Sequence, residues 1–151
     1  MNILMVCLGN ICRSPLAEGI LQDKSNALNL NWNVDSAGTI STHEGELPDV
    51  RSIEVANNHK IDITKQHSRP ITVSDFEVYD VIYVMDQSNY TDVLELAITD
   101  EQKDKVKIIL NESYPNENRN VPDPYYGGDE GFEKVFQMLD EACNIIIEKL
   151  K

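Results

Sequence analysis

Short apolar runs alternate along the chain with segments of helical periodicity. The first run covers residues 2–6 and ends at Gly9-Asn10, a pair that indicates a tight turn. Ser14-Pro15 follows, and a serine N-cap with proline in the first helical position is typical of a helix start. Apolar residues then recur at helical spacing. The opening of the chain therefore predicts a strand, a tight loop and a helix.

The same alternation continues through the rest of the sequence. Further strands are expected at three apolar runs, residues 32–36, 78–85 and 106–110, the first of them ended by Ala37-Gly38-Thr39. Further helices are expected at residues 48–58, with Val50, Ile53 and Ala56 facing inward, at residues 86–97 and at residues 130–149. Strands that alternate with helices predict an α/β fold. We expect a doubly wound parallel sheet of about four strands with helices on both faces and flavodoxin-like topology, in a single domain over residues 1–151.

The composition limits the possible partners. Of 151 residues, 41% are hydrophobic and 26% are charged, which predicts a globular chain rather than a disordered one. The formal net charge is −13. Such a surface repels nucleic acid and anionic membranes, so neither is expected as a partner. If the protein binds an anion, a local group of donors must override this field.

The chain has three cysteines, Cys7, Cys12 and Cys143. An odd count without a framework spacing argues against a secreted disulfide scaffold. The first residues lack the basic start and the long apolar run of a signal peptide, and no apolar stretch is long enough to cross a membrane. A cytoplasmic protein with free thiols is therefore expected.

Cysteine, five residues and arginine, Cys7 to Arg13, lie between the first strand and the first helix. A nucleophilic cysteine must be a thiolate, whereas a free thiol has a pKa of about 8.5. Backbone N–H groups at a helix N-terminus can stabilise such an anion and can also cradle phosphate oxygens. Arginine grips two phosphate oxygens, Gly9 and Asn10 tolerate positive φ, and Ser14 can donate its hydroxyl to the thiolate. The structural alternative, a buried cysteine followed by a surface arginine, is disfavoured by this context.

The run Cys7-Leu8-Gly9-Asn10-Ile11-Cys12-Arg13-Ser14-Pro15 resembles the phosphate-binding loop of the low-molecular-weight protein tyrosine phosphatases. The resemblance extends over the whole chain and includes Asp35-Ser36-Ala37-Gly38, His67-Ser68-Arg69-Pro70, Met85-Asp86-Gln87-Ser88-Asn89 and Val121-Pro122-Asp123-Pro124-Tyr125-Tyr126-Gly127. It implies a phosphatase that acts on phosphotyrosine in proteins and on small aryl phosphates through a phosphocysteine. The residues that it implies for phosphate binding are Leu8, Gly9, Asn10, Ile11, Cys12, Arg13 and Ser14.

Further expectations concern cofactors, small ligands and the oligomeric state. No metal or organic cofactor is expected, and no His/Cys/Asp cluster has the spacing of a zinc site. Inorganic phosphate or a similar oxyanion is expected as product or inhibitor. The protein is expected to be a monomer or to self-associate weakly.

Asp123 is the candidate for the general acid. A phenolate or alkoxide leaves a phosphate monoester poorly unless its oxygen is protonated, and a positioned carboxylic acid supplies that proton. Pro122 and Pro124 flank Asp123 and stiffen a loop, residues 111–128, that is long for a compact domain. The resemblance implies that Asp123 protonates the leaving oxygen and later activates water. An ordinary turn acid is the alternative.

Four residues are candidates for the walls of the substrate cleft. Tyr125 and Tyr126 can stack against a flat substrate, although one or both can equally pack the loop onto the domain. The family often carries an aromatic residue on the opposite wall, and here the nearest candidates in residues 38–45 are Thr42 and His43.

Three residues are expected to support the loop. Ser36 and His67 resemble family positions that brace it through hydrogen bonds, so His67 is expected to be buried and structural. Asp86 follows the third strand, where doubly wound sheets place their sites, and can orient the site or cap a helix. Cys12 is five residues from Cys7, and the resemblance implies that an oxidant can join the two in a reversible disulfide.

Two other functions remain to be weighed. An arsenate reductase coupled to thioredoxin shares this fold and loop, but its disulfide relay needs a cysteine pair, and residues 80–100 contain none. A phosphotyrosine-binding module without catalysis is the second alternative, and the presence of Cys7, Arg13 and Asp123 argues against it.

Overall fold

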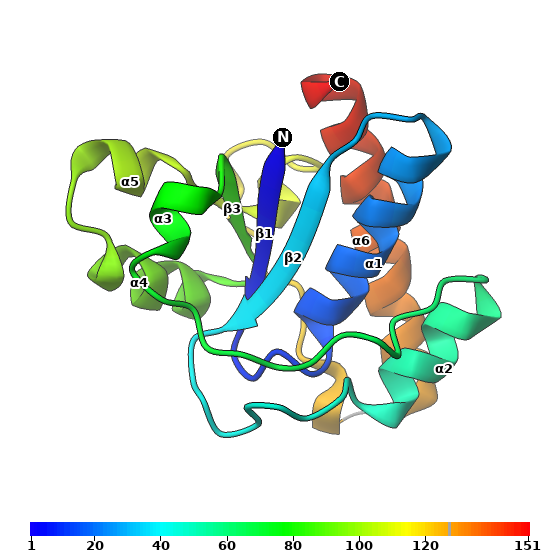
Figure 1. Ribbon diagram of the computed structural model, residues 1–151. Helices are drawn as coiled ribbons and strands as arrows, with labels where there is room; N and C mark the ends of the chain where they lie inside the picture. The colour runs from blue at the N-terminus through cyan, green and yellow to red at the C-terminus, as the bar shows by residue number, and fades with distance from the viewer. Residues whose placement is uncertain (127) are drawn as a thin grey trace.

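The computed structural model describes residues 1–126 and 128–151, apart from the side chains of Tyr126 and Asp129. Within these residues, four strands form one parallel sheet in the order β2-β1-β3-β4 (Figure 1). The strands are β1 (Asn2–Cys7), β2 (Asn33–Gly38), β3 (Val81–Val84) and β4 (Val106–Ile108). In the central pairings Val6 lies opposite Ala37 on β2 and opposite Val84 on β3. The carboxyl ends of these strands therefore lie together at one edge of the sheet.

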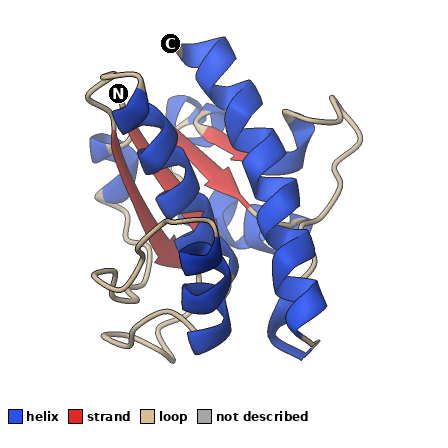
Figure 2. Ribbon diagram, turned by 90° about the vertical axis from the view of Figure 1, so that its right-hand side faces the viewer, coloured by secondary structure: helices blue, strands red, loops and turns tan. Residues whose placement is uncertain are grey.

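Helices cover both faces of the sheet, as the alternation predicts. On one face lie α1 (Arg13–Ala27), α2 (Val50–Asn58) and the long C-terminal α6 (Asp129–Leu150), and Figure 2 shows this layer in front of the strands. On the other face lie α3 (Asp75–Val78), α4 (Gln87–Leu96) and α5 (Asp100–Asp104) (Figure 1). Two 3-10 turns, η1 (Ile109–Asn111) and η2 (Pro124–Tyr126), complete the elements.

Each face of the sheet has its own hydrophobic core because side chains alternate along β1. Ile3 and Met5 pack with α1 and α6, whereas Leu4 and Val6 pack with the α3 and α4 side. All four side chains are fully buried. A central strand that is buried on both faces is rigid, and it ends at Cys7.

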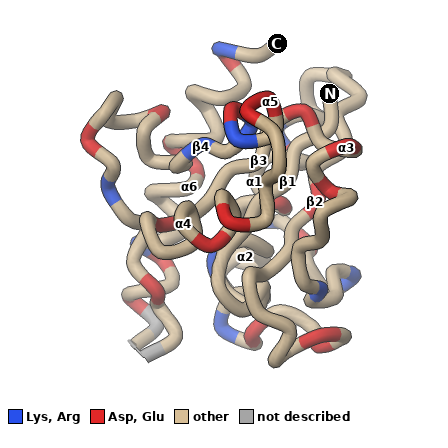
Figure 3. The backbone as a smooth tube through the Cα atoms, turned by 90° about the vertical axis from the view of Figure 1, so that its left-hand side faces the viewer, with Lys and Arg blue, Asp and Glu red and all other residues tan. Residues whose placement is uncertain are grey.

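The two ends of the chain leave the fold at the amino ends of the strands (Figure 1). Acidic positions outnumber basic ones along the backbone, 26 against 13 (Figure 3). None of the helices in the described part of the chain combines the length and the apolar character needed to cross a bilayer.

Several predicted element boundaries are wrong in an informative way. Helix α1 begins at Arg13 after an N-cap at Cys12, so Ser14 lies in its first turn and does not cap it. The segment Ala37-Gly38 continues β2 instead of ending it. Val50, which was expected to face inward, is 68% exposed; it is the first residue of α2, directly after the N-cap Asp49.

Two further differences concern short elements. The predicted strand 106–110 ends at Ile108, and η1 follows it. Helices α3 and α5 have four and five residues, too few to show a helical periodicity, and Val78, expected in the third strand, ends α3.

Candidate active site

Cys7 is the last residue of β1, and residues 8–12 connect it directly to the N-terminus of α1. This loop is tight enough that Asn10 adopts a left-handed conformation with φ of 57°. Asn10 and Cys7 are each 2% exposed. Gly9 does not need positive φ, contrary to expectation. A Cβ on Gly9 would instead lie 3.1 Å from Cδ2 of His43, so glycine allows that ring to approach.

The amide of Asn10 organises the polar contacts beneath the loop. Its Nδ2 donates to Oγ of Ser14 at 2.8 Å and to Oγ of Ser36 at 2.9 Å. Its Oδ1 accepts from the backbone N–H of Arg69 at 3.1 Å. Since Ser14 accepts from Asn10, its own hydroxyl hydrogen is available to Sγ of Cys7, which lies 3.1 Å away. The loop therefore directs a hydrogen-bond donor at the sulfur.

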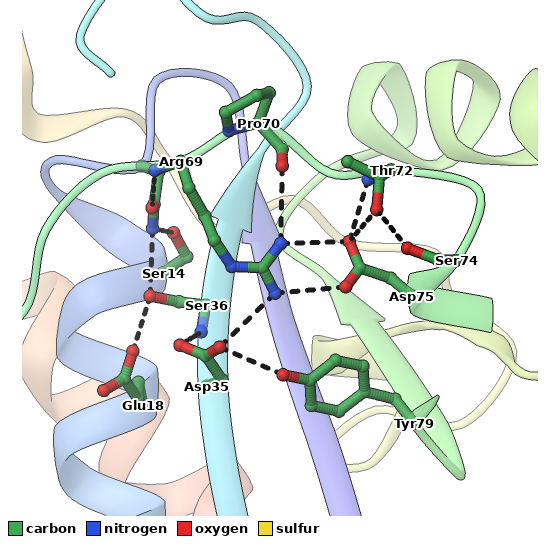
Figure 4. A network of polar contacts seen from close by, with 11 residues as sticks. Ser14, Glu18, Asp35, Ser36, Arg69, Pro70, Thr72, Ser74, Asp75 and Tyr79 are labelled. Atoms are coloured by element: carbon green, nitrogen blue, oxygen red, sulfur yellow. Dashed lines mark hydrogen bonds and ion pairs between the residues drawn. The ribbon is translucent and has the colours of Figure 1, made fainter. Parts of the chain in front are cut away.

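Ser36, which accepts from Asn10, is itself hydrogen-bonded to a residue of α1 (Figure 4). The hydroxyl of Ser36 donates to Oε1 of Glu18 at 2.6 Å. Glu18 has a pKa raised to about 7, because burial penalises its charged form more than the Ser36 hydrogen bond favours it. A titratable carboxyl group is thus linked through two side chains to the hydroxyl beside the sulfur.

Arg69 anchors the segment that contacts Asn10 (Figure 4). Its guanidinium lies 3.0 Å from a carboxylate oxygen of Asp75 and 3.3 Å from one of Asp35. Tyr79 donates its hydroxyl to the same oxygen of Asp35 at 3.0 Å. These contacts join β2, α3 and the segment before α3, so the backbone N–H that holds Asn10 comes from an anchored segment.

Arg13 is buried, and it enters the site already oriented. Its Nη1 donates to Oδ2 of Asp86 at 2.7 Å and to the carbonyl of Val121 at 3.0 Å. Its Nη2 lies 3.9 Å from Oδ2 of Asp123. Asp86 also caps α4, because its Oδ1 accepts from the N–H of Asn89 at 2.7 Å. Both roles considered for Asp86, helix N-cap and orienting partner, occur in the same side chain.

Asp123 and Cys7 line the same cavity of about 170 Å³. Its side chain is 38% exposed, and its Oδ1 accepts from the backbone N–H of Tyr125 at 3.0 Å. The described residues that line the cavity are Cys7, Leu8, Gly9, Ile11, Cys12, Arg13, Ile40, His43, Asp123 and Tyr125. The structure therefore brings cysteine, arginine and aspartate together within a mainly apolar wall.

Only some of the residues predicted for the wall of the cleft line the cavity. His43 and Tyr125 line the cavity, but Thr42 is exposed and outside its lining. Ile40, which sequence reasoning missed, takes part in the wall because its N–H bonds to the carbonyl of Leu8 at 3.1 Å. The prediction for the Tyr126 side chain lies outside the described residues.

The buried position expected for His67 is wrong, since its side chain is exposed. The next two residues contact the loop instead. Ser68 is 5% exposed and donates to the carbonyl of Gly9 at 3.0 Å, and Arg69 binds Asn10. Successive side chains in an extended segment point in opposite directions, so an inward Ser68 places His67 outward.

The other two cysteines are buried thiols. Burial and nearby charge, that of Asp49 first, raise the pKa of Cys12 to about 12, and burial raises that of Cys143 to about 12. All three cysteines are free. The disulfide between Cys7 and Cys12 stays a prediction.

The donors of this site suit an anion. The N-terminus of α1 and the Arg13 side chain lie at the cavity, and the Ser14 hydroxyl contacts the sulfur of Cys7, which lines it. Within residues 1–126 and 128–151, no group of three or more His, Cys, Asp or Glu residues is placed to hold a metal ion.

A phosphate-binding loop of this kind at the carboxyl edge of a parallel sheet defines the class of cysteine-based phosphatases. Within that class, residues 2–151 match the low molecular weight phosphotyrosine protein phosphatase family, and the chain belongs to it. The human low molecular weight phosphotyrosine protein phosphatase is 40% identical over 98% of this chain and 94% of its own length.

Two solved structures are similar to this chain over almost its whole length. A protein tyrosine phosphatase from Entamoeba histolytica, with Hepes in the active site, has a TM-score of 0.91 and 39% identity, covering 99% of this chain and 96% of that one. A Drosophila arginine phosphatase has a TM-score of 0.93 and 32% identity, covering 100% and 98%.

Proposed function

We propose that this protein hydrolyses phosphotyrosine in proteins, and small aryl phosphates, through a phosphocysteine formed on Cys7. The observation that carries the proposal is the convergence of Cys7, Arg13 and Asp123 on one cavity with a largely apolar wall. The description of the family to which the chain belongs, low molecular weight phosphotyrosine protein phosphatase, supports the phosphotyrosine part of the proposal.

Binding relies on groups that are in place before the substrate arrives. The phosphate dianion sits over the N-terminus of α1, where backbone N–H groups and Arg13 share its oxygens. Asp86 and Val121 hold one side of the guanidinium, so the enzyme need not reorganise it as charge spreads in the transition state. Hydrogen phosphate or another tetrahedral oxyanion should compete for the same donors.

The reaction has two displacement steps. The thiolate of Cys7 attacks phosphorus, the P–O ester bond breaks, and Asp123 gives its proton to the leaving oxygen. Asp123, now a carboxylate, takes a proton from water, which attacks the phosphocysteine and breaks the S–P bond. The hydroxyl of Ser14, 3.1 Å from Sγ, stabilises the departing thiolate. The products are the alcohol or phenol and inorganic phosphate.

The cavity wall favours an aryl substrate. Ile11, Ile40 and Tyr125 offer apolar and aromatic surface beside the loop, which suits the flat ring of phosphotyrosine. Phosphoarginine is a second candidate, because one similar structure is an arginine phosphatase. A guanidinium group would need polar partners where these apolar side chains lie, so we favour phosphotyrosine.

The arsenate reductase alternative meets a physical obstacle. All three cysteines of the chain are buried, and Cys143 lies in the core formed by α1 and α6. A relay must pass its disulfide to an exposed sulfur that thioredoxin can reach. We therefore retain the phosphatase. We further propose a cytoplasmic location, because a reducing compartment keeps three thiols free.

One assay tests the function. Phosphate release is measured from p-nitrophenyl phosphate, a phosphotyrosine peptide and a phosphoarginine peptide, for the wild type and Cys7→Ser. We expect the first two to be hydrolysed by the wild type only. Turnover by Cys7→Ser would refute the phosphocysteine intermediate. Faster hydrolysis of the phosphoarginine peptide than of the phosphotyrosine peptide would make phosphoarginine the substrate class instead of phosphotyrosine. A reduction of arsenate that requires thioredoxin would revive the alternative.

A further inference from the structure

Arg51, in the first turn of α2, lies between the phosphate loop and the segment that carries Asp123. On one side it is tied to the loop through Asp49. The N–H of Asp49 donates to the carbonyl of Ile11 at 2.8 Å. The carboxylate of Asp49 accepts from Nε and Nη2 of Arg51, each at 3.1 Å. The guanidinium is therefore held in one plane by a two-point contact.

On its other side the same guanidinium covers two aromatic rings. Its Cζ lies 5.4 Å from the ring centroid of Tyr125 and 4.6 Å from that of Phe132. Both distances are in the range of cation–π attraction. Tyr125 belongs to η2, and Phe132 to the first turns of α6, so Arg51 joins α2 to the two elements that follow Asp123.

Tyr125 in turn positions the acid. Its backbone N–H donates to Oδ1 of Asp123 at 3.0 Å, which leaves Oδ2 directed at the cavity side, 3.9 Å from Nη2 of Arg13. The chain of contacts runs from Ile11 through Asp49, Arg51 and Tyr125 to Asp123. It links the loop that holds the phosphate to the carboxyl group that must reach the leaving oxygen.

We propose that Arg51 is a positioning residue for Asp123, holding the acid segment in register with the phosphate loop through Tyr125. This inference rests on the proposed phosphatase function. Arginine suits the task because its planar fork can bind a carboxylate and cover a ring at the same time, which an ammonium group cannot do. Arg51 touches neither sulfur nor phosphate in this role, and it acts only through the placement of the acid.

The role predicts a particular kinetic signature. A misplaced acid delays departure of the leaving group, and the delay grows with the basicity of the leaving oxygen. Phenol therefore depends more on Asp123 than p-nitrophenol does. The value of kcat/KM reports this step, because it extends only to the first irreversible event.

The experiment compares Arg51→Met with the wild type on phenyl phosphate and p-nitrophenyl phosphate. We expect kcat/KM to fall on the order of 10-fold for phenyl phosphate and less than about 3-fold for p-nitrophenyl phosphate. In an Asp123→Asn background, Arg51→Met should cause no further selective loss, because there is no acid to position. Arg51→Lys should also lower kcat/KM more for phenyl phosphate than for p-nitrophenyl phosphate, but by smaller factors than Arg51→Met.

Arg119 offers a matched control. It binds the carboxylate of Glu117, two residues before it, and its Cζ lies 3.9 Å above the ring of Tyr114. These contacts resemble those of Arg51, but Arg119 is not among the residues that line the cavity. Arg119→Met should therefore leave the ratio of the two kcat/KM values unchanged.

The outcomes distinguish failure of the proposed phosphatase function from failure of the proposed role of Arg51. A wild type that hydrolyses neither ester would refute the proposed function itself. With an active wild type, equal losses on both esters, or a selective loss that persists in the Asp123→Asn background, would overturn the role of Arg51. If neither Arg51 variant shows a cooperative thermal transition, Arg51 is needed for folding and the positioning role is also overturned.

Discussion

Glu18 gives a pH-dependent contribution to stability with a definite sign. Its pKa is raised from the ordinary 4.5 to about 7, first by burial. The folded protein therefore holds a proton that the unfolded chain releases between those values, and the free energy of unfolding falls as pH rises through this window. About 1.4 kcal/mol per unit of pKa gives a total loss of at most roughly 3 kcal/mol, reached above pH 7. The stability that the protonated form supplies is complete below pH 4.5.

Glu18→Gln removes the ionisation and keeps an oxygen that can accept from Ser36. Urea unfolding at pH 5, 6, 7 and 8 measures the difference between variant and wild type. We expect the free energy of unfolding of the variant, relative to that of the wild type, to rise by roughly 2–3 kcal/mol between pH 5 and pH 8 and to level off above the pKa of Glu18. Glu44→Gln, at an exposed position, removes the same charge from this acidic protein and corrects for general repulsion. A gain that is the same at every pH, or equal to that of Glu44→Gln, would refute the reasoning.

Three further predictions concern the cavity. Asp123→Ala should lower kcat/KM for phenyl phosphate on the order of 10²-fold and leave phosphate inhibition in place; an unchanged rate would move the acid elsewhere. Gly38→Ala should destabilise the fold by about 1–3 kcal/mol in urea unfolding, because the new Cβ would lie 2.8 Å from the carbonyl oxygen of Leu8, and a stable variant would contradict this packing. Asn10→Ala should lower the free energy of unfolding by at least about 2 kcal/mol and also lower kcat/KM, since it leaves buried partners of the amide unsatisfied. A loss of activity without a loss of stability would be inconsistent with a bracing role.

The sequence predicted the parts of the fold that periodicity controls. The four strands, the helices between them and their parallel arrangement follow from apolar runs long enough to fill a core. The start of α1 was predicted two residues too late because Ser14 matches the chemistry of an N-cap. Its hydroxyl is used near the sulfur of Cys7 instead. Helices α3 and α5 are too short to produce a helical pattern.

The site was predicted where a local motif carries it and missed where tertiary contacts do. Cys7, Arg13 and Asp123 lie at one cavity because strand, helix and loop ends meet at one sheet edge. His67 was misplaced because a shift of one residue in an extended segment reverses which side chain points inward. Ile40 and Arg51 gave no local signal, since their roles depend on pairing across the loop and on the ring of Tyr125. The N-cap at Asp49 was the one available clue to the contacts of Arg51.

Both chain ends emerge at the side of the sheet away from the catalytic loop, and this has a practical use. A tag or surface tether joined to either end would start at the opposite end of the strands from the loop that follows β1 (Figure 1). Immobilised Cys7→Ser protein can therefore present an open site to a phosphoprotein mixture. The geometry favours capture experiments that would name the physiological substrate directly.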